Sequence, residues 1–221
     1  LSVMLEQGIV TPPEGGEVDI SGTSFVIGDT RVKPPRGRVE LNAEGAITAA
    51  LSFLDQEPLE LLQKVGKPVT LASGTVKATG FLELPLKKGI RLPDMDFDFA
   101  GTLSDVSSDQ VVVGRRITAQ SMQVSVQPDE LQIKGLAQFD GVPFDGSWTQ
   151  PLGTPGAGSV VAGQVTLSDQ AARTVGVALP NGMLSGEGPG EIRIDLAPGK
   201  PPEFRLTSTL SGLALRVAPL G

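Results

Sequence analysis

The feature that most constrains the fold of this chain is an alternation of apolar and polar residues with a period of two. The alternation is clearest in one acidic segment. Its odd-numbered positions include the apolar residues Met95, Phe97, Phe99 and Leu103, and its even-numbered positions include the polar residues Asp96, Asp98 and Thr102. Successive side chains of a β-strand point to opposite faces of its sheet. The pattern therefore predicts a strand with one apolar face and one polar face.

The same alternation recurs along most of the chain and predicts about ten strands in total. The other clear examples are residues 39–43, 47–53, 76–86, 122–126, 131–139, 161–167, 192–196 and 204–210. Short polar links that contain Gly or Pro, such as 127–130 and Asp140-Gly141, separate neighbouring segments. Links of this length favour hairpins, so we expect consecutive strands to pair antiparallel.

Two short segments predict helices instead of strands. Residues 58–65 have apolar side chains at helical spacing and end before Gly66. Residues 168–175 begin at Ser168, a preferred N-terminal cap, and end before Gly176. We therefore expect two short helices within a protein that is otherwise made of strands.

The two expected helices belong to an internal repeat. The matched dipeptides are Val65-Gly66 with Val175-Gly176 and, 112 positions apart, Ser73-Gly74 with Ser185-Gly186. Residues 97–103 match residues 204–210 at a separation of 107 positions. We therefore divide the chain into two related units, approximately 30–107 and 108–221. Such units stack edge to edge into an elongated sheet, and the start at Leu1, without an initiator Met or a signal region, indicates a segment of a larger repeat protein.

The amino-acid composition removes most catalytic chemistry. The 221 residues contain no His, no Cys and no Tyr, which excludes Ser-His-Asp triads, Cys nucleophiles, disulfides and zinc sites built from Cys and His. We therefore expect a protein that is not an enzyme and that has no cofactor or metal. A net charge of −7 with dispersed basic residues also disfavours nucleic acid as a partner, and no apolar run is long enough to span a membrane.

Several short motifs follow one another between residues 30 and 215. They are Pro-Leu-Glu-Leu-Leu at 58–62, Gly-Thr-Val at 74–76 leading to Leu-Pro-Leu at 84–86, the strand 97–106, Leu-Gln-Ile-Lys-Gly at 131–135, Gly-Val-Pro-Phe at 141–144 leading to Ser147-Trp148, and the segment that begins at Ser168. This order resembles the AsmA-like superfamily of bacterial envelope proteins, specifically the YhdP-type branch and its domain of unknown function. The motifs are loose and mostly structural.

The resemblance implies a protein that is anchored in the inner membrane of a Gram-negative bacterium. Its long periplasmic β-groove would assist the transfer of phospholipid between the inner and outer membranes. The partners would be phospholipid acyl chains and neighbouring repeats of the same chain, and contact with the membrane would pass through parts of the full-length protein outside this segment. The family has no catalytic residues that could be carried over to this sequence.

Together these observations predict a mainly β protein, an elongated and curved antiparallel sheet that forms a groove or a partly open barrel with two short helices. Its apolar positions are mostly Val, Leu, Ile and Ala, and only 4% of all residues are aromatic, so the apolar face suits acyl chains better than bases or sugars. The candidate residues that line the groove are Leu82, Leu84, Phe97, Phe99, Leu103, Ile133, Phe204 and Leu206. The alternative is a non-catalytic structural or assembly module of the cell envelope, whose apolar side chains are sealed under its own helices and whose edges dock other chains.

Two motifs resemble binding sites but have simpler interpretations. The spacing of Asp94, Asp96 and Asp98 is similar to a calcium loop, yet Phe99 stands where that loop needs Gly and Asp105 where it needs Glu. A strand with an acidic outer face is favoured. The glycine-rich residues 186–190 contain a Pro and precede a strand, so a bend in a curved sheet is favoured over a phosphate-binding loop.

Two further features leave alternatives open. Trp148, the one Trp of the chain, can contact a ligand, although a core position is the favoured interpretation. The basic pairs Arg115-Arg116 and Lys87-Lys88 can meet lipid headgroups at the rim of a groove. Solvated loop charges are the favoured interpretation of both pairs.

Overall fold

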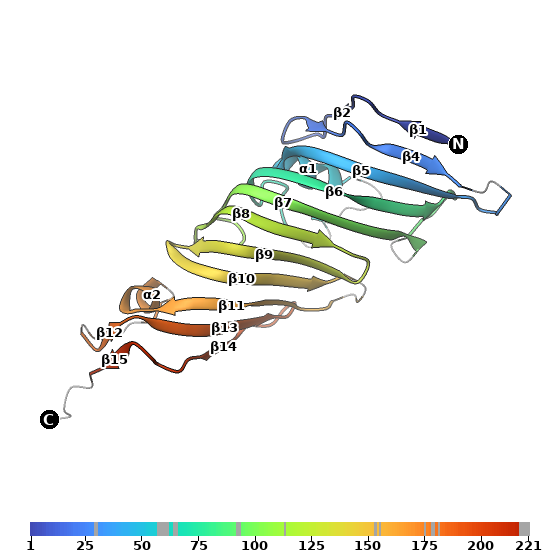
Figure 1. Cartoon of the computed structure of the whole chain (residues 1–221). Coiled ribbons are helices and arrows are strands. Elements are labelled where there is room, and N and C mark those ends of the chain that lie inside the picture. The colour runs from blue at the N-terminus through green and yellow to red at the C-terminus, as the bar shows by residue number, and fades with distance from the viewer. Residues whose placement is uncertain are drawn as a thin grey trace.

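The computed structural model describes residues 1–28, 31–56, 62–63, 66–91, 94–112, 114–152, 154, 156–174, 176–177, 180 and 182–216. Within these residues the chain forms one long antiparallel sheet, a separate two-stranded sheet and two short helices (Figure 1). Figure 1 shows an elongated, twisted sheet whose strands lie side by side from the blue N-terminal end to the red C-terminal end. The mainly β fold expected from the alternation is therefore confirmed.

The strands and helices have the following bounds. The strands of the long sheet are β1 (Ser2–Met4), β2 (Ile9–Val10), β3 (Val18–Asp19), β4 (Ser24–Ile27), β5 (Arg36–Ala46), β6 (Ser73–Pro85), β7 (Asp96–Ser108), β8 (Ile117–Val126), β9 (Glu130–Phe139), β10 (Val142–Pro151), β11 (Ser159–Leu167), β13 (Gly188–Leu196) and β14 (Glu203–Thr207). The small sheet pairs β12 (Leu184–Gly186) with β15 (Leu213–Leu215), and the helices are α1 (Ile47–Leu54) and α2 (Asp169–Thr174).

Strands that follow one another in sequence are neighbours in the long sheet. From β4 to β11 the spatial order is the sequence order, β13 and β14 continue it, and the pairs are antiparallel. The sheet is not closed into a barrel. The boundary expected between the two related units, near residue 107, falls inside β7, which pairs with both β6 and β8.

Both helices lie at the same end of the strands (Figure 1). α1 follows β5 and α2 follows β11, and these two strands run in the same direction because six antiparallel pairings separate them. We call this end, where links join β5 to β6, β7 to β8, β9 to β10 and β11 to β13, the helix edge. The opposite end, where links join β4 to β5, β6 to β7, β8 to β9 and β10 to β11, is the turn edge.

The first helix lies at a different place from the one predicted. The alternation at residues 47–53 predicts a strand, and this prediction is wrong because α1 occupies the segment. The residues between the apolar ones of this segment are small and uncharged, so they permit a helix as readily as a strand. Packing decides between the two, since Ala49 is fully buried and Ser52 Oγ accepts a hydrogen bond from the Glu14 N–H at 3.2 Å. The helix predicted at 58–65 lies largely outside the described residues.

The second helix lies where the sequence predicts it. Ser168 precedes α2, and its Oγ accepts a hydrogen bond from the backbone N–H of Ala171 at 3.1 Å, as an N-terminal cap does. Gly176, just beyond the helix, has a φ of +86°, in the left-handed region that glycine adopts at helix ends. Local sequence signals are therefore sufficient to place this helix.

The long sheet has no layer of comparable size packed against it within the described residues, where the two helices have only eight and six residues. The accessible surface is 14010 Å² for a mass of 22.9 kDa, whereas about 9,600 Å² is expected for a compact protein of this mass. Among the described residues no large side chain is fully buried. The apolar face of the sheet is consequently in partial contact with water along much of its length.

Two glycines lie opposite each other in the pair formed by β10 and β11, where the two strands approach closely. Gly146 lies opposite Gly163, and a Cβ on either residue would fall 2.4 Å or 2.3 Å, respectively, from a backbone oxygen of the partner strand. The ring of Phe144 covers both glycines. A ring above a glycine shields the backbone where a strand pair bends, and no larger residue fits beneath it.

Gly163→Ala is expected to destabilise the protein by roughly 1–3 kcal/mol, because the added methyl group must displace the carbonyl oxygen of Asp145. Gly28→Ala is the matched control, since no atom lies within 4 Å of the position of its Cβ. Thermal unfolding followed by circular dichroism measures both changes. Equal melting temperatures for the two variants would contradict the close approach of β10 and β11.

Candidate functional site

The register of the strands aligns apolar or small residues from nine strands in one row. The row crosses β5 to β11, β13 and β14 and consists of Ala43, Ala78, Gly101, Val124, Ile133, Trp148, Val161, Ile194 and Phe204. Residues that pair directly in antiparallel strands project from the same face of the sheet. We call the face that carries this row the apolar face. On each strand it also includes the alternate residues that project to the same side as the residue in the row.

The eight residues predicted to line a groove all lie on the apolar face. Their cross-strand pairs are Leu82 with Phe97, Leu84 with Gly37, Phe99 with Val126, Leu103 with Met122, Ile133 with Trp148, Phe204 with Ile194 and Leu206 with Ile192. Five of the eight lie together on β6 and β7, Ile133 lies in the middle of the sheet, and two lie on the terminal strand β14. They share a face rather than one enclosed pocket.

Exposure varies strongly along the apolar face. Phe97 is buried, and its ring stacks on that of Phe99 with the two ring centres 6.2 Å apart. Leu82, Leu84, Phe99, Leu103 and Ile133 are half-buried. Phe204 and Leu206 are 69% and 56% exposed. The face is therefore most enclosed at β6 and β7 and most open at β14.

Sequence reasoning missed part of the apolar face because a bulge changes the alternation. Asp105 on β7 has a φ of +52°, and the pairing of β8 with β9 shifts register between Thr118 and Gln123. After this shift Ile117 pairs with Phe139 and continues the apolar side towards the helix edge. The one signal in the sequence is the residue type, since Asp adopts a positive φ more often than most residues, and this preference is too weak to locate a bulge.

Trp148 lies in the middle of the apolar face. It pairs with Ile133 on one side and with Val161 on the other, and it is half-buried. The sequence interpretation favoured a core position, and the structure places the side chain on the same face as the predicted groove residues. Part of the indole therefore remains open to whatever contacts this face.

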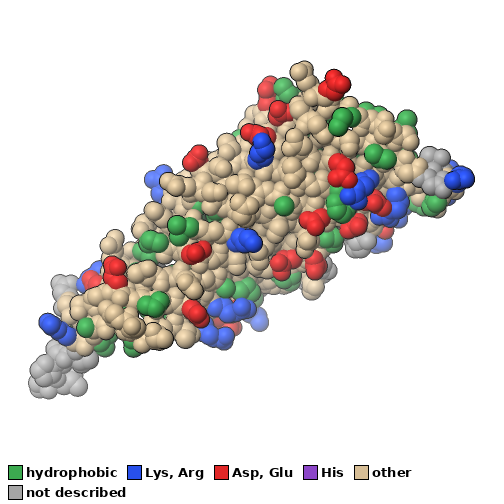
Figure 2. All heavy atoms as spheres, in the orientation of Figure 1, with side chains coloured by type: hydrophobic (Ala, Val, Ile, Leu, Met, Phe, Trp, Pro, Cys, Tyr) green, Lys and Arg blue, Asp and Glu red, His purple; other side chains and the backbone are tan. Residues whose placement is uncertain are grey.

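The opposite face of the sheet is polar, and its side chains pair across the strands. Arg36 and Arg38 both lie near Glu83, and Lys77 lies 3.0 Å from Glu44. Figure 2 shows one side of the molecule, on which basic and acidic side chains are spread between small, separate groups of hydrophobic ones. Exposed ion pairs contribute little stability individually, but together they keep this face compatible with water.

The acidic residues at 94–98 are divided between a turn and a strand. Asp94 accepts a hydrogen bond from the Arg91 N–H at 3.1 Å and pairs with Lys87 at 3.4 Å, and these contacts, led by the Arg91 N–H, lower the pKa of Asp94. Asp96 and Asp98 are exposed on the polar face of β7. Within the part of the chain that the structure describes, no group of three or more His, Cys, Asp or Glu side chains could hold a metal ion.

The glycine-rich segment 186–190 joins two strands. Gly186 ends β12 with a φ of +84°, and Gly188 begins β13. Gly190 pairs with Val165, and the Leu167 side chain lies 2.8 Å from the position that a Cβ of Gly190 would take. Gly190 therefore allows close contact between β11 and β13, whereas a Cβ on Gly186 or Gly188 would lie 2.2 Å or 2.4 Å from the carbonyl oxygen of Gly212 or Ser211, respectively.

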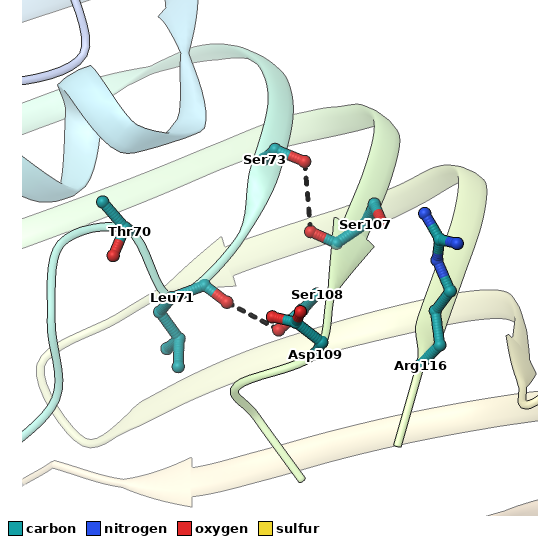
Figure 3. A pocket seen from close by; sticks show the side chains of 7 residues that line it. All are labelled: Thr70, Leu71, Ser73, Ser107, Ser108, Asp109 and Arg116. Atoms are coloured by element: carbon teal, nitrogen blue, oxygen red, sulfur yellow. Dashed lines mark hydrogen bonds between the residues drawn. The ribbon is translucent and has the colours of Figure 1, made fainter. Parts of the chain in front are cut away.

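A polar hollow of about 370 Å³ lies at the helix edge (Figure 3). Its lining residues are Thr70, Leu71, Ser73, Ser107, Ser108, Asp109 and Arg116. Ser108 Oγ donates a hydrogen bond to the Leu71 carbonyl at 2.6 Å, and Ser73 Oγ donates one to the Ser107 carbonyl at 3.2 Å. These hydroxyl groups fasten the link that precedes β6 to the end of β7.

Arg115 fastens α2 to the helix edge. Its Nη1 donates hydrogen bonds to Asp140 Oδ2 at 3.0 Å and to the Thr174 carbonyl at 2.7 Å. The backbone N–H of Arg116 donates to Asp140 Oδ1 at 2.7 Å. The hydrogen bond from the Arg116 N–H, followed by that from Arg115, lowers the pKa of Asp140. The Arg115 guanidinium thus stabilises the fold by holding α2 at this edge.

Within the described residues, neither helix has the length and apolar character needed to cross a membrane. No family model matches the sequence, and no curated protein or solved structure matches it either. The function is therefore proposed from the sequence and the geometry of the chain itself. Its most extensive feature is the apolar face.

Asp140→Asn is expected to loosen α2 and to lower the melting temperature at pH 7, because Arg115 loses its charged partner. The pKa of Asp140 is lowered in the folded state, so its stabilising effect is present above the unfolded pKa and is lost as the pH falls through the folded pKa. The difference in melting temperature from the wild type should therefore shrink as the pH falls below 3.8, the ordinary pKa of Asp. Asp129→Asn, at an exposed turn, is the control, and a difference that did not change with pH would contradict this role.

Proposed function

We propose that this chain is a non-catalytic, lipid-binding segment of a periplasmic groove that assists phospholipid transfer between the inner and outer membranes. The observation that carries the proposal is the row of apolar and small residues across nine strands of a sheet that is not closed into a barrel. The resemblance to the AsmA-like superfamily supports the same function. It also supports a periplasmic location, with inner-membrane anchoring through other parts of the full-length protein.

Burial of apolar surface would drive the binding of acyl chains. Each methylene group that leaves water contributes about 0.8 kcal/mol, and the half-buried side chains of the apolar face would lose further contact with water. Leu82, Ile133 and Val161 represent the aliphatic character of this face. A smooth aliphatic surface places few geometric demands on a flexible chain, whereas bases and sugars need stacking partners and directed hydrogen bonds.

The dimensions of the face suit an extended acyl chain. Neighbouring strands lie about 4.8 Å apart, so the eight steps from Ala43 to Phe204 span about 38 Å. An acyl chain occupies one leaflet, about half of a hydrocarbon core that is about 30 Å thick. A chain lying along the row would therefore fit within it, and a headgroup could remain in solvent at an edge of the sheet.

A structural or assembly role is the second candidate, and the free edge at β14 favours it. All five residues of β14 are exposed, and among the described residues β13 is its one partner strand in the long sheet. Phe204 and Leu206 extend the apolar face to this edge. An exposed edge strand with apolar side chains can pair with another strand, such as one from a neighbouring repeat of the same chain.

Native mass spectrometry after purification without detergent is expected to find phospholipid bound to the wild-type chain. Ile133→Glu places a charge in the middle of the apolar row and should reduce the bound lipid roughly tenfold or more. Leu136→Glu is the matched control, because Leu136 lies on the same strand, projects from the opposite face and is 60% exposed. A lipid-free wild type, or equal loss in both variants, would favour the structural role.

Trp148 provides a second and independent measurement. The chain has one Trp and no Tyr, so its fluorescence reports on the middle of the apolar face. Phospholipids brominated along their acyl chains are expected to quench this emission, whereas the same lipids without bromine should not. Absence of quenching at a lipid concentration that saturates binding would place the lipid away from β9, β10 and β11.

A further inference from the structure

Two segments at the turn edge carry basic side chains and no acidic ones. Residues 31–38 read Arg-Val-Lys-Pro-Pro-Arg-Gly-Arg, and residues 87–91 read Lys-Lys-Gly-Ile-Arg. Together they hold seven of the 18 Lys and Arg residues of a chain whose net charge is −7. Positive charge is therefore concentrated in a small part of a negatively charged protein. We call these two segments the basic corner.

The two segments of the basic corner are adjacent in space. Arg36, at the start of β5, pairs with Pro85, at the end of β6. The Leu86 N–H donates a hydrogen bond to the Pro35 carbonyl at 2.8 Å. In Figure 2, basic side chains lie among acidic ones at the end of the molecule that holds the turn edge of β4 to β7. The two segments of the basic corner are thus joined through the start of β5 and the end of β6.

Neighbouring carboxylates neutralise only part of this charge. Glu83 lies near Arg36 and Arg38, and Asp94 pairs with Lys87. Within the described residues, neither Lys33 nor Lys88 takes part in an ion pair, and both are exposed. Their ammonium groups remain available to an external anion.

An apolar side chain accompanies these charges. Val32 stands between Arg31 and Lys33 and is 57% exposed. A surface that combines Lys and Arg with an exposed apolar side chain suits the interface of an anionic bilayer, where phosphates lie above the acyl boundary. Nucleic acid suits it less, because the basic corner has no aromatic side chain for base stacking.

The apolar face reaches the basic corner. Leu84, one of its residues, lies one position before the end of β6 and pairs with Gly37, inside the basic corner. Surfaces that suit headgroup phosphates and acyl chains therefore meet at the turn edge of β5 and β6. At the other apolar margin, Arg205 of β14 pairs with Arg193, and Glu203 of β14 pairs with Asp195, so basic and acidic side chains are mixed there.

We propose that the basic corner docks the turn edge of the sheet on the surface of an anionic phospholipid bilayer. Lys33 and Lys88 contact headgroup phosphates, and Val32 enters the headgroup region. Docking brings the β5–β6 end of the apolar face next to membrane lipid. Its purpose therefore rests on the lipid-binding function proposed above. Docking itself does not require the apolar face to hold lipid.

Sedimentation of the 221-residue chain with vesicles tests this inference. The wild type is expected to bind vesicles of phosphatidylglycerol and phosphatidylcholine, to bind pure phosphatidylcholine weakly, and to dissociate as salt screens the charges. Each Lys near an anionic surface contributes about fivefold to binding, so Lys33→Gln/Lys88→Gln should weaken it roughly 25-fold. Lys134→Gln/Lys200→Gln, with the same change of charge at exposed positions elsewhere, is the control.

Equal binding by the two double variants, equal binding of the wild type to both kinds of vesicle, or equally tight binding to duplex DNA would overturn the proposal. Melting temperatures establish that both variants are folded. Native mass spectrometry of Lys33→Gln/Lys88→Gln should still find the lipid of the apolar face. A chain that sediments with anionic vesicles but purifies without lipid would retain the docking surface and contradict the lipid-binding groove.

Discussion

The structure depends on the pairing of apolar side chains between adjacent strands of a sheet that lacks a facing layer in its described residues. Each cross-strand pair, such as Leu82 with Phe97 or Ile133 with Trp148, contributes only about 0.2–1 kcal/mol. Many pairs are consequently needed. The strands from β5 to β11 have nine to 13 residues, compared with about five or six in an ordinary sheet. Long strands, each with many cross-strand pairs, thus provide the stability that a thicker hydrophobic core provides in other proteins.

The two ends of the strands have different tasks. At the helix edge, Ser108, Arg115 and Asp140 fasten successive links and α2 to the sheet. At the turn edge the links place several charges in solvent, among them Lys33 and Lys88. One edge thereby stabilises the sheet, while the other is left free to meet an external surface. The proposed functions use this division, with acyl chains on the apolar face and headgroups at the turn edge.

The apolar face could be predicted because the alternation of side chains follows from strand geometry alone. The strands at residues 97–103 and 131–139 could be predicted without knowledge of the strands that pair with them. The helix α1 could not be predicted in this way, since its burial depends on a contact between Ser52 and Glu14, 38 positions apart. The bulge at Asp105 is a backbone conformation with only a weak residue signature, since Asp is among the non-glycine residues that adopt a positive φ more often than others.

The basic pairs illustrate the same limit for the candidate sites. Arg115-Arg116 and Lys87-Lys88 are equivalent in the sequence, which permits loop charges or headgroup contacts as the interpretation of either pair. In the structure, Arg115 donates hydrogen bonds to Asp140 and to the end of α2. Within the described residues, Lys88 has no ion-pair partner. The difference arises from residues that are distant in the chain, so only the three-dimensional arrangement separates a structural pair from an available one.

The sequential order of the strands has a consequence for how such a protein can change in size. Because each strand from β6 to β10 pairs, within the described residues, only with the strands before and after it, the energy of this part of the sheet is close to a sum of nearest-neighbour terms. Gain or loss of one hairpin would alter the span by about 10 Å, two strand spacings, and would leave the remaining pairs intact. Evolution can therefore adjust the reach of this architecture in whole hairpins, without redesigning a shared core.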